Sequence, residues 1–165
     1  MTLPTNSFHA QHSPMGAHSS FTVGMYGAQG GMALEKGGPA DSAVFVGYRS
    51  ASGQMVTLPF YKGISNEAER YSKPEEAADK GLAILGEGEI ERSYGWASDK
   101  FKARGITFKI STPFFSIPDP AVADDETLKF ASLPATFLEL TIKNISSETW
   151  EGFFALEGAT PWTPL

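Results

Sequence analysis

The stretch ITFKIS, residues 106–111, alternates apolar and polar residues at every position. Successive side chains of a β-strand point to opposite faces, so this pattern predicts a strand with its isoleucines and phenylalanine buried on one face. Residues 138–143 alternate in the same way, which places Leu138, Leu140 and Ile142 inward. Half-buried strands are therefore the first structural prediction for this chain.

Turn-forming residues between apolar segments predict three hairpins, because glycine, serine and asparagine favour reversal of the backbone. These hairpins join residues 43–48 with 54–58, residues 89–96 with 101–111, and residues 138–143 with 150–156.

Helix is expected in only two short segments. Residues 120–130 are the better candidate, with Asp119 as N-cap, Pro120 in the first turn and three acidic residues near the positive end of the helix dipole. Residues 75–85 are weaker because Gly81 interrupts them. Many short strands and little helix predict a mainly β fold, an antiparallel β-sandwich with one or two short helices.

Composition limits the classes of function. A chain of 165 residues suits one domain, and its formal charge of -6, with scattered lysines and arginines, argues against a nucleic-acid partner. Without cysteine it has no disulfide, thiolate metal site or cysteine nucleophile. No apolar run is long enough for a membrane span, and the first twenty residues lack a signal-peptide pattern. We therefore expect a soluble cytoplasmic protein with no membrane partner.

All three histidines of the chain fall in the stretch FHAQHSPMGAHSSF, residues 8–21. Imidazole is a common zinc ligand, so His9, His12 and His18 are candidate ligands. In an extended segment, however, His9 and His12 point to opposite faces, and Pro14 prevents a regular helix. These histidines are better explained as structural residues, and we expect no metal and no cofactor.

Other local chemistry is equally unspecific. Ser13 beside His12 lacks the geometry of a nucleophile and its base. Glu89 and Glu91 would share one face of a strand, where solvated charges ordinarily lie. No catalytic residue is therefore assigned from the residues themselves. Exposed aromatic rings can stack on sugars, which makes Trp96, Trp150 and Trp162 candidates for a sugar platform.

The stretch of residues 6–17, NSFHAQHSPMGA, followed by SFTVG at 20–24, resembles the start of the family 52 glycoside hydrolases, which are β-xylosidases. Further blocks that are similar to this family follow in order: VFVG at 44–47, LPF at 58–60, IER at 90–92, STP at 111–113, IPDP at 117–120 and FFALEG at 153–158.

This resemblance implies a two-part enzyme, an N-terminal β-sandwich followed by a larger (α/α)6 barrel that carries the catalytic carboxylates. It implies retaining hydrolysis of a terminal β-xylosyl unit of a xylo-oligosaccharide, with nucleophile and acid/base carboxylates about 5 Å apart. Neither catalytic position matches a residue of this chain, so the chain alone is expected to be inactive. Residues 1–158 would be the sandwich, and residues 159–165 would begin the linker to an absent barrel.

The leading hypothesis is a non-catalytic sandwich whose partner is the barrel. His12, Ser13 and Pro14 are then candidates for the domain interface or the substrate pocket, because a polar segment with a fixed proline bend can present groups to a neighbouring site. A purely structural role for this segment stays open. Two alternatives also stay open: a free-standing carbohydrate-binding module, and an interaction domain for oligomer contacts such as a homodimer.

Overall fold

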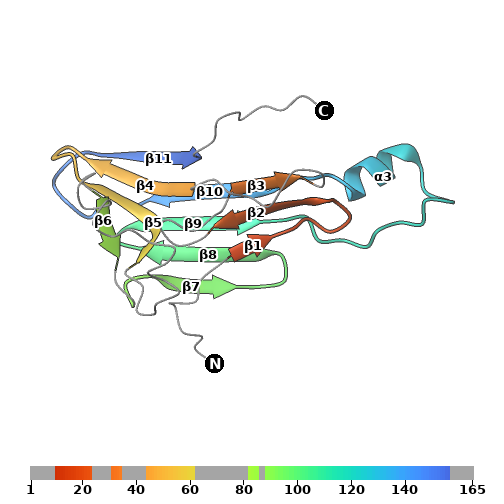
Figure 1. The fold of residues 1–165 in the computed structure, drawn as a ribbon, viewed down its shortest axis with the longest axis horizontal. Helices are drawn as coiled ribbons and strands as arrows, with labels where there is room; N and C mark the ends of the chain where they lie inside the picture. The colour runs from red at the N-terminus through yellow and green to blue at the C-terminus, as the bar shows by residue number, and fades with distance from the viewer. Residues whose placement is uncertain (1–9, 24–30, 35–43, 62–81, 86–87, 157–165) are drawn as a thin grey trace.

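The computed structural model describes residues 10–23, 31–34, 44–61, 82–85 and 88–156 (Figure 1). Within them the chain forms, in order, the elements β1 (Ala10–His12), β2 (Ser19–Val23), β3 (Gly31–Leu34), β4 (Val44–Ser50), β5 (Met55–Tyr61), β6 (Leu82–Leu85), β7 (Glu91–Tyr94), β8 (Ser98–Ala103), β9 (Ile106–Ser111), α3 (Asp125–Ala131), β10 (Phe137–Ile142) and β11 (Trp150–Leu156).

The described strands form three open sheets. The first has the order β1-β2-β3, the second β11-β4-β5-β6 and the third β10-β9-β8-β7. Neighbouring strands are antiparallel except β5 and β6, which pair in parallel. The predicted fold class, an antiparallel β-sandwich with little helix, is confirmed.

One hydrophobic core joins all three sheets. A series of phenylalanine rings connects them: Phe21 of β2 and Phe108 of β9 each lie 6.5 Å from Phe154 of β11, and Phe101 of β8 lies 6.4 Å from Phe108. Each apolar residue of the stretch 106–111 is buried, as its alternation predicts. Leu138, on the equivalent face of β10, is 37% exposed, so the core covers that strand less completely.

The first predicted hairpin is confirmed. β4 and β5 pair antiparallel, with Tyr48 opposite Val56. The backbone reverses at Gly53, which has φ +89° and donates its N–H to the Ser50 carbonyl oxygen. Glycine adopts such a φ without the steric cost that a Cβ imposes.

The predicted hairpin of residues 89–96 with 101–111 is confirmed only in part, because residues 89–111 form three strands rather than two. β7 pairs with β8, and β8 pairs with β9. The second reversal lies at Arg104 and Gly105, with φ of 43° and 83°. Two consecutive residues of positive φ are typical of a tight two-residue hairpin turn. Arg104 and Gly105 therefore form the turn that joins β8 to β9.

The predicted hairpin of residues 138–156 is wrong. β10 pairs with β9 of the third sheet, whereas β11 pairs with β4 of the second. The indole of Trp150 stacks on the Tyr48 ring at a centroid distance of 3.8 Å, which fixes β11 to β4. Gly152 allows the two sheets to approach closely, because a Cβ there would lie 2.7 Å from Cδ1 of Ile142.

A helix does form in the predicted segment 120–130, but it begins five residues later than predicted. Helix α3 covers Asp125–Ala131, and its N-cap is Asp124 rather than Asp119. Asp119 instead accepts a hydrogen bond from the Ala121 backbone N–H in a preceding turn. Of the second predicted helix, residues 82–85 form strand β6, and residues 75–81 lie outside the described residues.

Residues 112–136, which connect β9 to β10 and include α3, form what we call the arm. In Figure 1 the arm extends beyond the ends of the strands. Ala131 is the one residue of the arm that is buried. No helix within the described ranges is long and apolar enough to cross a membrane. The cytoplasmic location stays a prediction.

Candidate functional site

His12 ends strand β1 opposite Phe21, on the face that packs toward the core. Its side chain is 12% exposed, and its Nε2 lies 3.5 Å from Oδ2 of Asp99 on β8. Nε2 makes no hydrogen bond of normal geometry, so the contact with Asp99 is mainly electrostatic. His12 therefore joins the first sheet to the third through a charged group.

Asp99 forms a bidentate ion pair with Arg92 of β7. The Arg92 Nε donates to Oδ1 and Oδ2 of Asp99 at 3.0 and 3.1 Å, and Nη2 also donates to Oδ2. The guanidinium lies 5.2 Å from the ring centre of Tyr94 and 5.5 Å from that of Phe101. Hydrogen bonds and ring contacts together hold the arginine in one position.

We call these three residues the His12–Asp99–Arg92 cluster. Burial acts to raise the pKa of Asp99, but its contacts with His12 and Arg92 outweigh burial and hold that pKa below its ordinary value. Asp99 is therefore a carboxylate at neutral pH although its side chain is only 2% exposed. The cluster keeps a charge inside the sandwich because the Arg92 guanidinium is paired with it.

The residues after His12 lead from this cluster to the arm. Ser13 is exposed, whereas Pro14 is buried. Gly16 has φ +81°, and a Cβ at this position would lie 2.7 Å from the carbonyl oxygen of Ala131. The loop between β1 and β2 thus packs directly against the end of α3, which brings two distant parts of the sequence together.

A shallow, open hollow of about 350 Å³ lies beside this loop. Its lining includes Gln11, Ser13, His18 and Ser20, which carry amide, hydroxyl and imidazole groups. His18 therefore lies in a different environment from His12, and His9 is outside the described residues. Across the described parts of the chain no group of three or more histidine, aspartate and glutamate side chains is placed to hold a metal ion.

The two glutamates considered as a pair lie in separate exposed ion pairs. Glu89 precedes β7 and accepts hydrogen bonds from the Arg104 guanidinium. Glu91, in β7, lies 3.7 Å from Nζ of Lys102. Both carboxylates are exposed, although only Glu91 lies on a strand and Glu89 precedes it.

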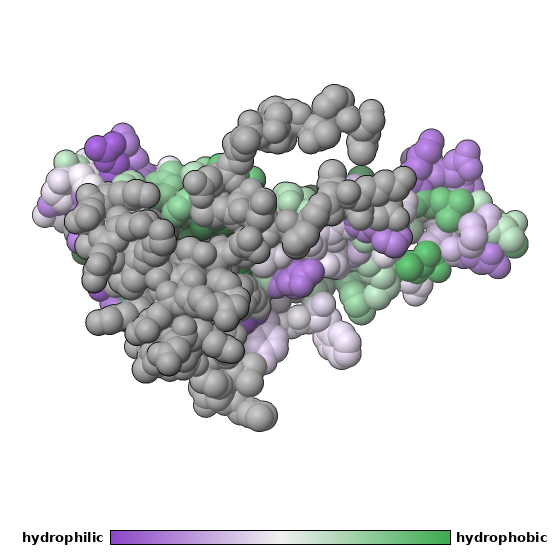
Figure 2. Space-filling model, in the orientation of Figure 1, coloured by the Kyte–Doolittle hydropathy of each residue, from purple (hydrophilic) through white to green (hydrophobic). Residues whose placement is uncertain are grey.

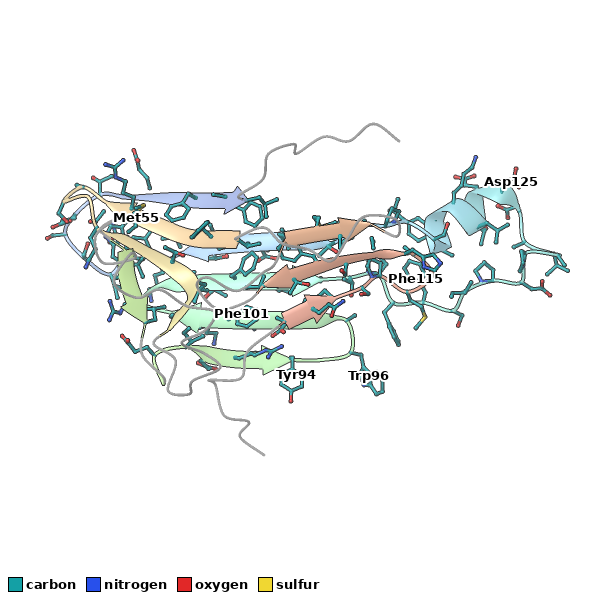
Figure 3. All side chains as sticks on the ribbon, in the orientation of Figure 1. Met55, Tyr94, Trp96, Phe101, Phe115 and Asp125 are labelled. Atoms are coloured by element: carbon teal, nitrogen blue, oxygen red, sulfur yellow. The ribbon has the colours of Figure 1, made fainter. Side chains whose placement is uncertain are left out.

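The candidate sugar-stacking residues differ in exposure. Trp96, in the turn between β7 and β8, is 92% exposed. It projects from the same edge of the molecule as the exposed Tyr94 (Figure 3), and its ring lies 6.1 Å from that of Phe114. Trp150 is partly buried against the core and stacked on Tyr48. Trp162 lies outside the described residues.

Residues 21–165 match the sequence pattern of glycosyl hydrolase family 52. The chain belongs to this family. Two curated relatives, each a "Beta-xylosidase" of Geobacillus stearothermophilus, are 37% identical over 172 residues and 33% identical over 168 residues. These alignments cover 99% and 93% of this chain but 24% and 27% of the relatives. The chain thus spans about a quarter of the length of the curated relatives that it matches.

Membership of family 52 confirms the resemblance seen in the sequence, but the His12–Asp99–Arg92 cluster was only partly foreseen. His12 was a candidate, whereas Asp99 and Arg92 were not. The segment SDKFKA of β8 contains a usable signal, because Asp99 shares the inward face with Phe101 and Ala103. A charged residue at an apolar position of an alternating strand indicates a buried ion pair.

Proposed function

We propose that this chain is the non-catalytic β-sandwich of a retaining β-xylosidase that releases terminal xylose from xylo-oligosaccharides. The catalytic carboxylates would then lie in the portion of the family 52 polypeptide that this chain does not span. The names of two relatives and the coverage of about a quarter of their length support this proposal.

The observation that carries the non-catalytic role is the pairing of three described carboxylates with structural partners. A retaining glycosidase needs two carboxyl groups about 5 Å apart that are free to reach one sugar. In this chain Asp99 is paired inside the sandwich, Glu89 is bonded to Arg104, and Asp124 caps α3. Each of these carboxylates has a structural partner, which favours a supporting role for the domain.

We also propose that His12, Ser13 and Pro14 lie at the boundary with the catalytic portion. The cluster fixes the start of this segment, and Gly16 fixes its end against the arm. A segment held at both ends can present the exposed Ser13 hydroxyl in a defined direction. In the longer enzyme, His12→Ala should raise KM for a β-xyloside; unchanged KM and kcat would remove this part of the proposal.

The deciding experiment measures hydrolysis of a chromogenic β-xyloside by the 165-residue chain and by a chimera. In the chimera this chain replaces the matching quarter of the 37%-identical β-xylosidase. We expect activity in the chimera and none in the chain alone. Hydrolysis by the 165-residue chain would overturn the non-catalytic role and return attention to its own carboxylates.

A free-standing carbohydrate-binding module is the second candidate function, favoured by the exposure of Trp96 and the nearby rings of Tyr94 and Phe114. Such rings offer apolar faces on which sugars stack. Titration of the chain with xylo-oligosaccharide would then show binding that Trp96→Ala abolishes. A flat titration up to millimolar ligand would exclude this candidate.

A further inference from the structure

The arm is an ordered segment without a core of its own. Its exposed apolar residues are 37% to 83% accessible to solvent: Phe114, Phe115, Ile117, Val122, Phe130 and Leu133. Monomeric proteins seldom leave many large apolar side chains together on one segment, because their burial is the main favourable term in folding. This surface is therefore suited to be covered by another chain or domain.

The sandwich supports the helix of the arm mainly at its end, through the loop between β1 and β2. Helix α3 has seven residues, and isolated helices of that length are marginal in water. It has an N-cap from Asp124 and one ring contact, Phe130 stacked on Phe115 at 5.2 Å. Within α3 only Ala131 is buried, so much of its apolar surface remains exposed in this chain.

Acidic residues accompany these apolar residues along the arm. The arm carries four carboxylates, on Asp119, Asp124, Asp125 and Glu126, and one basic residue, Lys129. In Figure 2 hydrophobic and strongly hydrophilic residues adjoin at this end of the molecule. Acidic side chains beside apolar ones complement a partner with an apolar groove and basic residues at its edge.

From these observations we propose that the arm is the docking surface for the part of the family 52 polypeptide that this chain does not span. That partner would bury Phe115 and Phe130 in an apolar groove flanked by lysine or arginine. The inference rests on the proposed function, because it takes the remaining three quarters of the relatives' length as the partner.

Two other occupants fit the arm less well. A second copy of this chain would bring the acidic arm of one protomer against that of the other, and like charges repel. A sugar needs hydrogen-bonding side chains beside an aromatic face, whereas the exposed apolar residues of the arm are phenylalanine and aliphatic side chains. A covalently linked partner also acts at high effective concentration, which favours it over a separate molecule.

The test compares radical footprinting of the arm in the 165-residue chain and in the chimera described above. We expect Phe115 and Phe130 to be labelled strongly in the chain and to lose most of that labelling in the chimera. Ile145, which is 67% exposed in the connection between β10 and β11, is the reference and should be labelled equally in both.

Two variants give an independent measurement. The chain is mixed with the separately expressed remainder of the same relative, and Phe130→Asp is compared with Ile145→Asp. Loss of a central apolar contact should weaken capture of the remainder about tenfold or more for Phe130→Asp, with no change for Ile145→Asp. This comparison tests docking through the arm even if the chimera does not fold.

The outcomes separate the two proposals. An active chimera whose arm is labelled as in the free chain would overturn docking through the arm and leave the proposed function standing. A folded chimera with a protected arm but no xyloside hydrolysis would support docking and count against the proposed function. Sedimentation of the free chain as a dimer that Phe130→Asp dissociates would assign the arm to a second copy and overturn the proposal.

Discussion

At the scale of single residues, Asp99 shows how a charge is accommodated in an apolar sandwich. Its carboxylate faces the Arg92 guanidinium from β7 and the His12 imidazole from β1, so a group of opposite charge and a polar ring replace the water lost on burial. The arginine in turn lies over the rings of Tyr94 and Phe101. The stability of this arrangement depends on all of its members being present.

We expect Asp99→Asn to lower the free energy of unfolding by about 3 kcal/mol, because it removes the buried negative charge that faces Arg92. Urea denaturation measures this change. Glu91→Gln is the control, since its ion pair with Lys102 is exposed, and a change within about 0.5 kcal/mol is expected. Equal losses of unfolding free energy for the two substitutions would show that burial does not determine the strength of the Asp99–Arg92 ion pair.

The lowered pKa of Asp99 also predicts how the free energy of unfolding changes at acidic pH. Its pKa is lower in the folded chain than in the unfolded chain, so its contribution is fully present above the unfolded pKa of about 4. That contribution is lost as the pH falls through the lower folded pKa. Unfolding measured from pH 7 to pH 2 should show the wild type and Asp99→Asn converging below about pH 4; a constant difference would contradict this linkage.

At the scale of elements, the loop between β1 and β2 is fitted to the arm by one glycine. Gly16 combines a positive φ with a close approach to the backbone of Ala131. Gly53 in the β4–β5 turn has a similar φ, but a Cβ there would meet no atom within 4 Å. A Cβ at Gly53 would therefore cause backbone strain alone, whereas a Cβ at Gly16 would cause both strain and a steric clash.

Gly53→Ala should cost about 1–2 kcal/mol of unfolding free energy from backbone strain alone. Gly16→Ala should cost clearly more, because its Cβ must also displace the end of α3. Denaturation of both variants by urea gives the comparison. If the two substitutions cost the same, the loop is not packed against the arm as described.

Strand β11 is attached to the second sheet through Trp150. Trp150→Ala should lower the free energy of unfolding by about 3 kcal/mol, because it removes the ring stacked on Tyr48. Trp96→Ala, at a residue that is 92% exposed, should change it by less than about 0.5 kcal/mol. Thermal unfolding of both variants tests this, and a loss for Trp96→Ala would mean that its ring is packed in solution.

The sequence predicted elements best where the deciding contacts are local. Alternation placed Ile106, Phe108 and Ile110 in the core, and the turn at Gly53 revealed the β4–β5 hairpin. The partner of β11 was predicted wrongly because the Trp150–Tyr48 contact joins residues about a hundred positions apart. Local pattern cannot distinguish a returning hairpin from a strand that crosses to another sheet.

At the scale of the whole molecule, the arm and the strands differ in how many buried contacts stabilise them. The strands β8 and β9 contribute most of their inward side chains to one core shared by three sheets. The arm contributes Ala131 alone among its 25 residues, from 112 to 136, as a buried side chain. Local opening of the arm should therefore require far less free energy than global unfolding.

Hydrogen exchange followed by mass spectrometry should show this difference. Peptides from residues 112–136 are expected to exchange much faster than peptides from residues 98–111, because opening the arm exposes little core. The same measurement on the chimera should slow exchange in the arm alone. Equal protection of both segments in the free chain would contradict the view that the arm has little tertiary support.

The candidate site was visible in the sequence only in part. His12, Ser13 and Pro14 stood out because they lie in an unusual histidine-containing stretch, whereas their environment comes from β7, β8 and the arm. Those contacts depend on how three sheets pack together, and strand periodicity carries no information about that packing. Strand alternation predicted the fold class, the family resemblance supplied the family, and the structure supplied the neighbours of His12.

The pairing of β11 with β4 has a consequence for how the protein is made. Residue 44 pairs with residue 156, so a strand that leaves the ribosome early must wait for most of the chain before its neighbour exists. During that interval one edge of β4 has unpaired backbone N–H and C=O groups that can pair with a strand of another chain, which is a route to aggregation. Pairing over so long a separation is also slow to form. Synthesis at reduced temperature or with chaperones should therefore improve the yield of folded chain more than any change at its surface.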